Sequence, residues 1–364
     1  MVEKRPIDKL TIKGFKTLQD VELELGKLNV LIGPNGAGKS NFVSYFRMLH
    51  ELVEGRLRRW TVKQVGADRV LTYGSKRTPE LISQLAFGLN RYDFTLTPIA
   101  DYFVFADERT SYGDAYARGF SLGSWHEESL LKTQLRPTNP RRSDWIYAAI
   151  SNWKIYHFHD TSESAPVKLT GGLHDNQYLR HDARNLAAYL YMLRRDDESA
   201  YNQIVRILRL ALPFLHDFVL EPEQVRPDEY SIQLRWQGKD SDEPFLASQL
   251  SDGSLRFICL VTALMQPDPP ATIIIDEPEI GLHPYAITLL GSLLHSASER
   301  MQIIVATQSV AMVNQFSIGD LIVVELKAGS SVFKRHMESE YELWLEDYSV
   351  GELWEKNVLG GRLT

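Results

Sequence analysis

Cysteine and long apolar runs are both scarce in this sequence, and each scarcity excludes a class of protein. Cys259 is the single cysteine among 364 residues, so an internal disulfide and a cysteine-based zinc site are excluded. No apolar run reaches the length of a membrane-spanning helix, and charged residues lie near Met1 where a secretory signal would be apolar. We therefore expect a cytoplasmic protein that does not act at a membrane.

Sustained heptads, internal repeats and low-complexity tracts are missing as well. Their absence excludes a long coiled-coil arm and a repeat architecture. The chain is 44% apolar, which is enough to bury a sizeable core in one large domain or two. Its net charge of −7 argues against a protein that binds nucleic acid with its whole surface.

A glycine-rich loop follows the apolar run Leu28–Ile32 and leads into a helical apolar pattern. It reads Gly33-Pro34-Asn35-Gly36-Ala37-Gly38-Lys39-Ser40-Asn41. Between a strand and a helix, the backbone N–H groups of such a loop point at nucleotide phosphates, and glycine permits the turn and the close approach. Lys39 would reach the β- and γ-phosphate oxygens, and the Ser40 hydroxyl would ligate Mg²⁺. We therefore predict that this loop binds a nucleoside triphosphate.

Two adjacent acids, Asp276 and Glu277, end a second apolar run at Thr272–Ile275. The run is typical of a strand that is buried on both faces of a mostly parallel sheet. Neighbouring residues at a strand end project differently, so we predict that Asp276 holds Mg²⁺ beside Ser40 while Glu277 activates the attacking water. With these two acids, the site is predicted not only to bind the nucleotide but also to hydrolyse it.

The order of strands and helices predicts an α/β fold. Strand, helix and strand follow one another over residues 272–306, which is typical of doubly wound sheets that bind ligands at the carboxyl ends of their strands. Residues 7–32 and later short runs such as Val70–Tyr73 indicate a β-rich flank. Farther along, Tyr230–Trp236 is predicted as one strand, and Asp182 is predicted to cap a helix.

Further motifs carry a resemblance to a known family. They are Thr11-Ile12-Lys13-Gly14-Phe15-Lys16, then Leu250-Ser251-Asp252-Gly253-Ser254, and finally Ile273-Ile274-Ile275-Asp276-Glu277-Pro278 with Glu279-Ile280-Gly281-Leu282-His283-Pro284 directly after it. The second and third resemble the signature and Walker B motifs of ABC-type ATPases. With the first, the chain is similar to the SMC-like branch of AAA family ATPases, stand-alone proteins related to RecF and to the ATPase domain of overcoming-lysogenization-defect nucleases.

The resemblance implies an ABC/SMC-type P-loop ATPase head with a β-rich N-terminal flank and an inserted α+β lid region. We accordingly expect residues 1–50 and 235–335 to form a bipartite ATP-binding head. Residues 51–234 would be the inserted lid or partner-binding region, and the acidic residues 336–364 would pack on the head. The implied cofactors are ATP and Mg²⁺.

The resemblance also implies a homodimer, or a higher even oligomer, in which heads join head to tail around ATP. Ser251 and Gly253 would contact the γ-phosphate of an ATP molecule bound by the other subunit, since a hydroxyl and an N–H at a helix N-terminus attract anions. Asp252 replaces the usual glycine and brings a carboxylate close to phosphate. Gln308 takes the switch position, where many relatives have histidine; an amide can position water but accepts no proton at neutral pH. We therefore expect slow ATP hydrolysis.

Two assignments stay open. ABC-type heads carry a metal-contacting glutamine in a lid after the phosphate loop, and both Gln64 and Gln84 are candidates. His157 and His159 alternate on a predicted strand, with Asp160 next to them. They could form a nuclease metal site, although aromatic core and loop positions are the simpler interpretation.

The sequence and the resemblance together suggest three alternative biological roles. The first is a regulatory ATPase of prokaryotic phage defence that controls a nuclease or other effector encoded separately. The second is a RecF-like DNA-repair clamp. Its DNA contact would be the region Glu54–Arg77, which has seven Lys or Arg against two acids, although a solvated helix end would have the same composition. The third is an intrinsic nuclease built on His157 and His159.

Overall fold

The computed structural model describes residues 5–113, 119–135 and 142–361. The chain forms two compact units, called here the first and the second unit. The first comprises Met1–Ile155, Pro270–Ile274 and Met301–Thr364, and the second comprises Tyr156–Pro269 and Ile275–Arg300. These units cut across the expected segments, because residues 51–155 share the first unit with residues 1–50.

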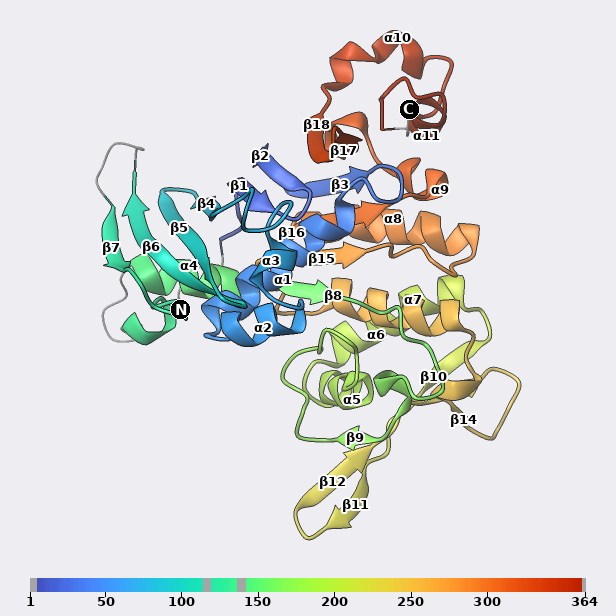
Figure 1. Ribbon diagram of the computed structural model, residues 1–364. Coiled ribbons are helices and arrows are strands. Elements are labelled where there is room, and N and C mark those ends of the chain that lie inside the picture. The colour runs from blue at the N-terminus through green and yellow to red at the C-terminus, as the bar shows by residue number, and fades with distance from the viewer. Residues whose placement is uncertain (1–4, 114–118, 136–141, 362–364) are drawn as a thin grey trace. The chain divides into compact units, whose positions relative to one another are not determined.

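An antiparallel six-stranded sheet forms one part of the first unit (Figure 1). In spatial order its strands are β2 (Leu18–Glu24), β1 (Lys9–Phe15), β4 (Leu81–Phe87), β5 (Asn90–Ile99), β6 (Tyr102–Tyr112) and β7 (Phe120–Gly123). Alternate residues of β1, β4 and β5 are buried, as expected for a sheet with one covered face. The predicted β-rich flank is confirmed.

Four helices of the first unit are α1 (Lys39–Val53), α2 (Leu57–Lys63), α3 (Ala67–Val70) and α4 (Arg142–Ser151). Helix α1 lies in the core: its Phe42 and Phe46 are fully buried, and the Phe46 ring centroid is 5.1 Å from that of Trp153. The predicted strand Val70–Tyr73 is wrong. Val70 ends α3, and Tyr73 has a left-handed backbone with φ of 58°, which no strand accommodates.

The glycine-rich loop follows one strand of a second six-stranded sheet. Its order is β18 (Ser330–Arg335), β17 (Leu321–Lys327), β3 (Leu28–Ile32), β16 (Gln302–Thr307), β15 (Thr272–Asp276) and β8 (Lys154–Tyr156). Strands β16 and β17 pair in parallel with the two sides of β3. Every residue of β3 and β16 is buried, as their continuous apolar sequence predicts. The α/β fold class is therefore confirmed.

The second unit combines four helices with two small sheets (Figure 1). The helices are α5 (Leu186–Asp196), α6 (Glu198–Ala211), α7 (Asp252–Met265) and α8 (Pro284–Ser298). One sheet has the order β10 (Leu215–Val219), β13 (Arg235–Gly238), β14 (Phe245–Leu246), and the other has β11 (Glu223–Arg226), β12 (Glu229–Ile232), β9 (Gly171–Gly172). The predicted single strand Tyr230–Trp236 is two strands, because β12 pairs with β9 whereas β13 pairs with β10.

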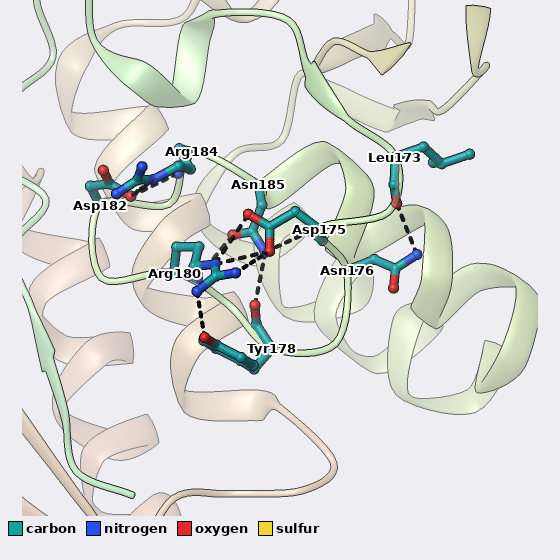
Figure 2. A network of polar contacts seen from close by, with 8 residues as sticks. All are labelled: Leu173, Asp175, Asn176, Tyr178, Arg180, Asp182, Arg184 and Asn185. Carbon is teal, nitrogen blue, oxygen red and sulfur yellow. Dashed lines mark hydrogen bonds and ion pairs between the residues drawn. The ribbon is translucent and has the colours of Figure 1, made fainter. Parts of the chain in front are cut away.

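A polar network fixes the loop that precedes α5 (Figure 2). The Asn185 amide donates to the main-chain oxygens of Asp175 and Tyr178 over 2.9 and 2.8 Å, and its Oδ1 accepts the Arg180 N–H at 2.9 Å. The Arg180 guanidinium contacts the Asp175 carboxylate at 2.8 Å. Asp182 does not cap the helix as predicted, since α5 begins at Leu186 and Asp182 accepts a bond from its neighbour Arg184.

The C-terminal part of the first unit contains α9 (Val310–Val313), α10 (Glu342–Leu345) and α11 (Val350–Glu355). It is fastened by long-range hydrogen bonds: Gly351 N donates to Asn314 Oδ1 at 2.7 Å, and Gly361 N donates to Glu325 Oε1 at 2.7 Å. Among the described residues, no helix has both the length and the apolarity that crossing a bilayer requires.

Candidate functional site

The glycine-rich loop joins β3 to α1, and three of its glycines are required for different reasons. Gly36 and Gly38 have φ of 79° and 116°, conformations that other residues rarely adopt. A Cβ on Gly33 would collide with the main-chain oxygen of Val324, and one on Gly38 would collide with Ser331. The sheet and the loop therefore fix the conformation of this stretch of backbone.

Lys39 begins α1 and turns its ammonium into the loop. Its Nζ donates to the main-chain oxygens of Gly33 at 2.6 Å and Pro34 at 3.1 Å, and only 5% of the residue is exposed. A cation held inside a glycine loop at a helix N-terminus is suited to a phosphate chain. The residues present fit a nucleoside triphosphate on this observation.

A hydrogen-bonded network of Ser331, Thr17 and Asn41 contacts the loop at Ala37. The Ser331 Oγ donates to Ala37 O at 2.7 Å and lies 2.7 Å from Thr17 Oγ1, which also accepts a bond of 2.8 Å from the Asn41 amide. Ser331 lies on β18 and is 1% exposed. Thr17 and Ser331 were not predicted from the sequence, because 314 positions separate them and neither belongs to a motif.

The two lid candidates occupy different places in the first unit. Gln64 follows α2, and its Oε1 accepts a 3.5 Å bond from Lys16, whose Nζ also donates to Ser44 of α1 at 3.0 Å. Burial, followed by the nearby Arg47, lowers the pKa of Lys16. Gln84 is an exposed residue in the middle of β4. Gln64 is therefore the one connected to the helix that starts at the phosphate loop.

Gln308 directly follows β16, and its place relative to the loop is set by strand pairing. Thr307 pairs with Ile32, so Gln308 and Gly33 continue from the same edge of the sheet. Gln308 is exposed. The next residue, Ser309, caps α9 and donates its N–H to Thr307 Oγ1 at 3.0 Å. The structure thus brings the predicted switch residue and the phosphate loop together within the first unit.

The predicted acids lie at the end of β15, where the chain continues into the second unit. Residues Thr272–Ile275 are buried, whereas Asp276 and Glu277 are partly exposed. Glu277 has φ of 45°, a left-handed conformation that costs about 1–3 kcal/mol in residues other than glycine. Such strain persists where the surroundings impose it, and it concentrates at functional positions.

His159 contacts the backbone of Asp276 within the second unit. Its Nε2 is 2.9 Å from the main-chain oxygen of Asp276. A carbonyl only accepts, so Nε2 carries the hydrogen. The ring of His157 lies 4.4 Å from that of His159, between centroids. Over the described part of the chain, no group of three His, Cys, Asp or Glu side chains is arranged to hold a metal, so the nuclease interpretation gains no support.

The predicted signature residues lie at the N-terminus of α7. Ser251 is the exposed cap, and its Oγ accepts the Ser254 N–H at 3.2 Å. Gly253 is buried, and a Cβ there would collide with the main-chain oxygen of Gly281. Both residues, together with Asp276 and Glu277, belong to the second unit, whereas the phosphate loop belongs to the first.

Arg256, one turn into α7, connects the elements of the second unit that carry these residues. Its Nε donates to Phe158 O at 2.9 Å, its Nη2 donates to His159 O at 3.4 Å, and its Nη1 donates to Ile280 O. The residue is 6% exposed, and burial lowers the pKa of its guanidinium. Its role was missed from the sequence, where an arginine on a helix is ordinary.

Comparison with known proteins agrees with this geometry. The family model described as “AAA domain, putative AbiEii toxin, Type IV TA system” matches residues 28–314. Among solved structures, the chain is similar to an SMC head bound to the C-winged helix domain of ScpA, with a TM-score of 0.61 and 14% identity over 92% of this chain and 99% of that chain. It is also similar to a Smc head domain with an extended coiled coil, bound to the C-terminal domain of ScpA derived from Pyrococcus furiosus. That TM-score is 0.52, at 16% identity over 94% of this chain and 99% of the other.

At these identities the structural likeness establishes the fold, which is that of an SMC-type ATPase head. No curated protein matches the chain.

Proposed function

The chain belongs to the AAA family whose model matches residues 28–314, and from this premise we propose that it binds ATP with Mg²⁺ and hydrolyses ATP slowly. The observation that carries the proposal is the buried Lys39 ammonium inside a glycine loop between a parallel strand and a helix. In this proposal the loop from Gly33 to Asn41 holds the phosphates. Ser40 and Asp276 hold Mg²⁺, which supplies Lewis-acid stabilisation of the charge that develops on phosphate.

Glu277 is the proposed residue that orients and deprotonates the attacking water, and Gln308 is proposed to position that water. An imposed left-handed backbone at Glu277 supports a functional role for this position. Gln308 offers an amide and no proton acceptor, so the reaction depends on one carboxylate. Slow turnover suits a switch better than a motor.

We further propose that two copies close head to tail around ATP, or that pairs of such heads build a higher even oligomer. Ser251 is exposed at the N-terminus of a 14-residue helix, where a hydroxyl and N–H groups are available to an anion. An isologous interface would supply two such caps, one for each ATP. Gly253 would serve through its backbone N–H, while its missing side chain allows the close packing against Gly281.

As the biological role, we propose regulation of a separately encoded effector in prokaryotic phage defence. The family description, which names a toxin, supports an effector-linked role. The RecF-like alternative relies on the basic region, and there Arg58 contacts Glu127 at 2.7 Å while Arg56 contacts Glu51 at 2.7 Å. These ion pairs reduce the charge that the region offers to DNA, so the effector role is preferred.

The test is Mg²⁺-dependent release of phosphate from ATP by the purified chain, compared with Glu277→Gln. The amide keeps the shape of the side chain and removes the base, so turnover should fall at least about 100-fold while ATP affinity stays. Glu243→Gln, an exposed loop position, is the matched control and should hydrolyse at the parent rate. Parent-like turnover by Glu277→Gln would remove Glu277 from the proposal.

A further inference from the structure

The first unit contains a cavity of about 710 Å³ that the proposed ATPase function does not use. Its walls come from β5, β6 and β7 of the antiparallel sheet and from the start of α4. Sites for small molecules in proteins have volumes of roughly 300–1,000 Å³, so the cavity is large enough for one. None of the predicted phosphate-loop, signature or acidic residues lines it.

Three polar side chains in the cavity wall are buried. Asn90, Thr110 and Ser143 are 9%, 2% and 5% exposed, respectively. Sites for small molecules combine an apolar lining with a few polar groups that fix the orientation of the ligand. An amide and two hydroxyl groups in this wall suit a ligand that has hydrogen-bonding groups of its own.

The charged side chains among the described residues of the cavity wall are positive. Arg5 and Arg142 contribute to the wall, and no carboxylate is among the described residues that form it. Guanidinium groups bind phosphate and carboxylate oxygens with two parallel hydrogen bonds. The cavity therefore favours a ligand that carries an anionic group.

Aromatic rings form the remaining wall. Tyr112 and Phe120 are 52% and 58% exposed, and Trp145 lies in the first turn of α4. The Arg142 guanidinium carbon lies 6.0 Å from the centroid of the Tyr112 ring. Exposed aromatic faces beside an arginine form a stacking platform for planar rings. The ligand that fits has a flat ring as well as an anionic group.

We propose that this cavity binds a nucleotide monophosphate unit, either as a free nucleotide or as the 5′ end of a single strand. Its base stacks on Trp145, with Tyr112 and Phe120 as the neighbouring rings, while its phosphate contacts Arg142 and Arg5. Asn90 donates to and accepts from the edge of the base, as an amide does in pairing with a purine or pyrimidine. This site is separate from the phosphate loop, so its existence does not depend on ATP hydrolysis.

The test is calorimetric titration of the full chain carrying Lys39→Ala, which disables the phosphate loop, with AMP, GMP, CMP, UMP and inorganic phosphate. We expect one nucleotide per chain for at least one of the four. Asn90→Leu and Arg142→Ala should each weaken that binding at least tenfold. Arg109→Ala is the control, since Arg109 is an exposed residue of β6 that pairs with Asp107 and does not line the cavity.

A second readout guards against variants that lose their fold. Stacking should quench tryptophan fluorescence on titration of the parent chain, and Trp145→Phe should remove that quenching while retaining binding. Tighter binding of a 5′-phosphorylated trinucleotide would identify a strand end as the ligand, and exclusive binding of the mononucleotide would identify a free nucleotide. The proposal is overturned if none of the four nucleotides binds, if phosphate binds as tightly as they do, or if both cavity variants bind normally.

Discussion

His159 Nε2 donates a 2.9 Å hydrogen bond to the main-chain oxygen of Asp276, at the point where β15 ends. The bond joins the segment after β8 to the strand that carries the proposed metal ligand and the proposed base. The next residue, Glu277, has a left-handed backbone. A donor that fixes the carbonyl before a strained residue restricts how that residue can turn, so we expect His159 to position the two proposed acids.

Replacing His159 with leucine should therefore lower ATP turnover by about tenfold or more, with little change in ATP affinity, because a small displacement of a reacting group is costly. His159→Gln, whose amide can donate to the same oxygen, should recover part of the rate. His216→Leu, at an exposed position of β10, is the control. The measurement is steady-state turnover with a separate ATP titration. Equal rates for the leucine and glutamine variants would contradict the role.

Arg256 should be required for stability as well as turnover. Methionine at this position would leave one buried and two partly buried main-chain oxygens without their donor, and we expect the free energy of unfolding to fall by about 2–4 kcal/mol. Arg256→Lys should recover only part of it, since one ammonium cannot match the guanidinium fork. Urea unfolding measures this, with exposed Arg206→Met of α6 as the control. Parent-like stability of Arg256→Met would mean that these bonds contribute nothing.

A shared ATP site makes a specific prediction for mixed subunits. Lys39→Ala and Ser251→Arg should each be inactive, because each composite site needs both residues. In a mixed dimer both lesions fall on one site and the other site is intact, so mixing should recover up to half of the parent rate if the sites act independently. Phosphate release, measured after subunit exchange has been demonstrated, tests this. If no activity returns, the two sites are either strictly coupled or not shared between subunits. Cysteines placed near Ser251 and near Gly36 on different subunits distinguish these cases, because a shared site predicts an ATP-dependent crosslink between them. Absence of that crosslink would reject the head-to-tail dimer.

Local signals were sufficient to predict the strands that adjoin the proposed phosphate site. The run Leu28–Ile32, the glycines and Lys39 are contiguous, and β16 and β15 appear in the sequence as uninterrupted apolar runs. The strand predictions failed where the pairing of strands decides their boundaries. Residues Tyr230–Trp236 divide between two sheets, and no local sequence pattern reveals this division.

The supporting residues could not be found from the sequence for the same reason. Thr17 and Ser331 form a hydrogen bond next to the loop only because β18 returns the chain to it. Arg256 donates to main-chain carbonyl oxygens, which every residue has and which therefore give no sequence signal. His159 was identified as a metal-ligand candidate, whereas the structure gives it a carbonyl partner. Side chains that act through backbone groups are therefore the part of a site that motifs miss.

The central claim is that the glycine loop with Lys39 binds ATP, and calorimetric titration of MgATP into Lys39→Ala tests it most directly. Removing the one side-chain cation inside the loop should weaken ATP binding at least about 100-fold relative to the parent chain. Lys13→Ala, an exposed lysine of β1 whose Nζ lies 3.3 Å from Asp20, should bind ATP like the parent. Undiminished ATP affinity in Lys39→Ala would contradict the assignment of this loop as the nucleotide site.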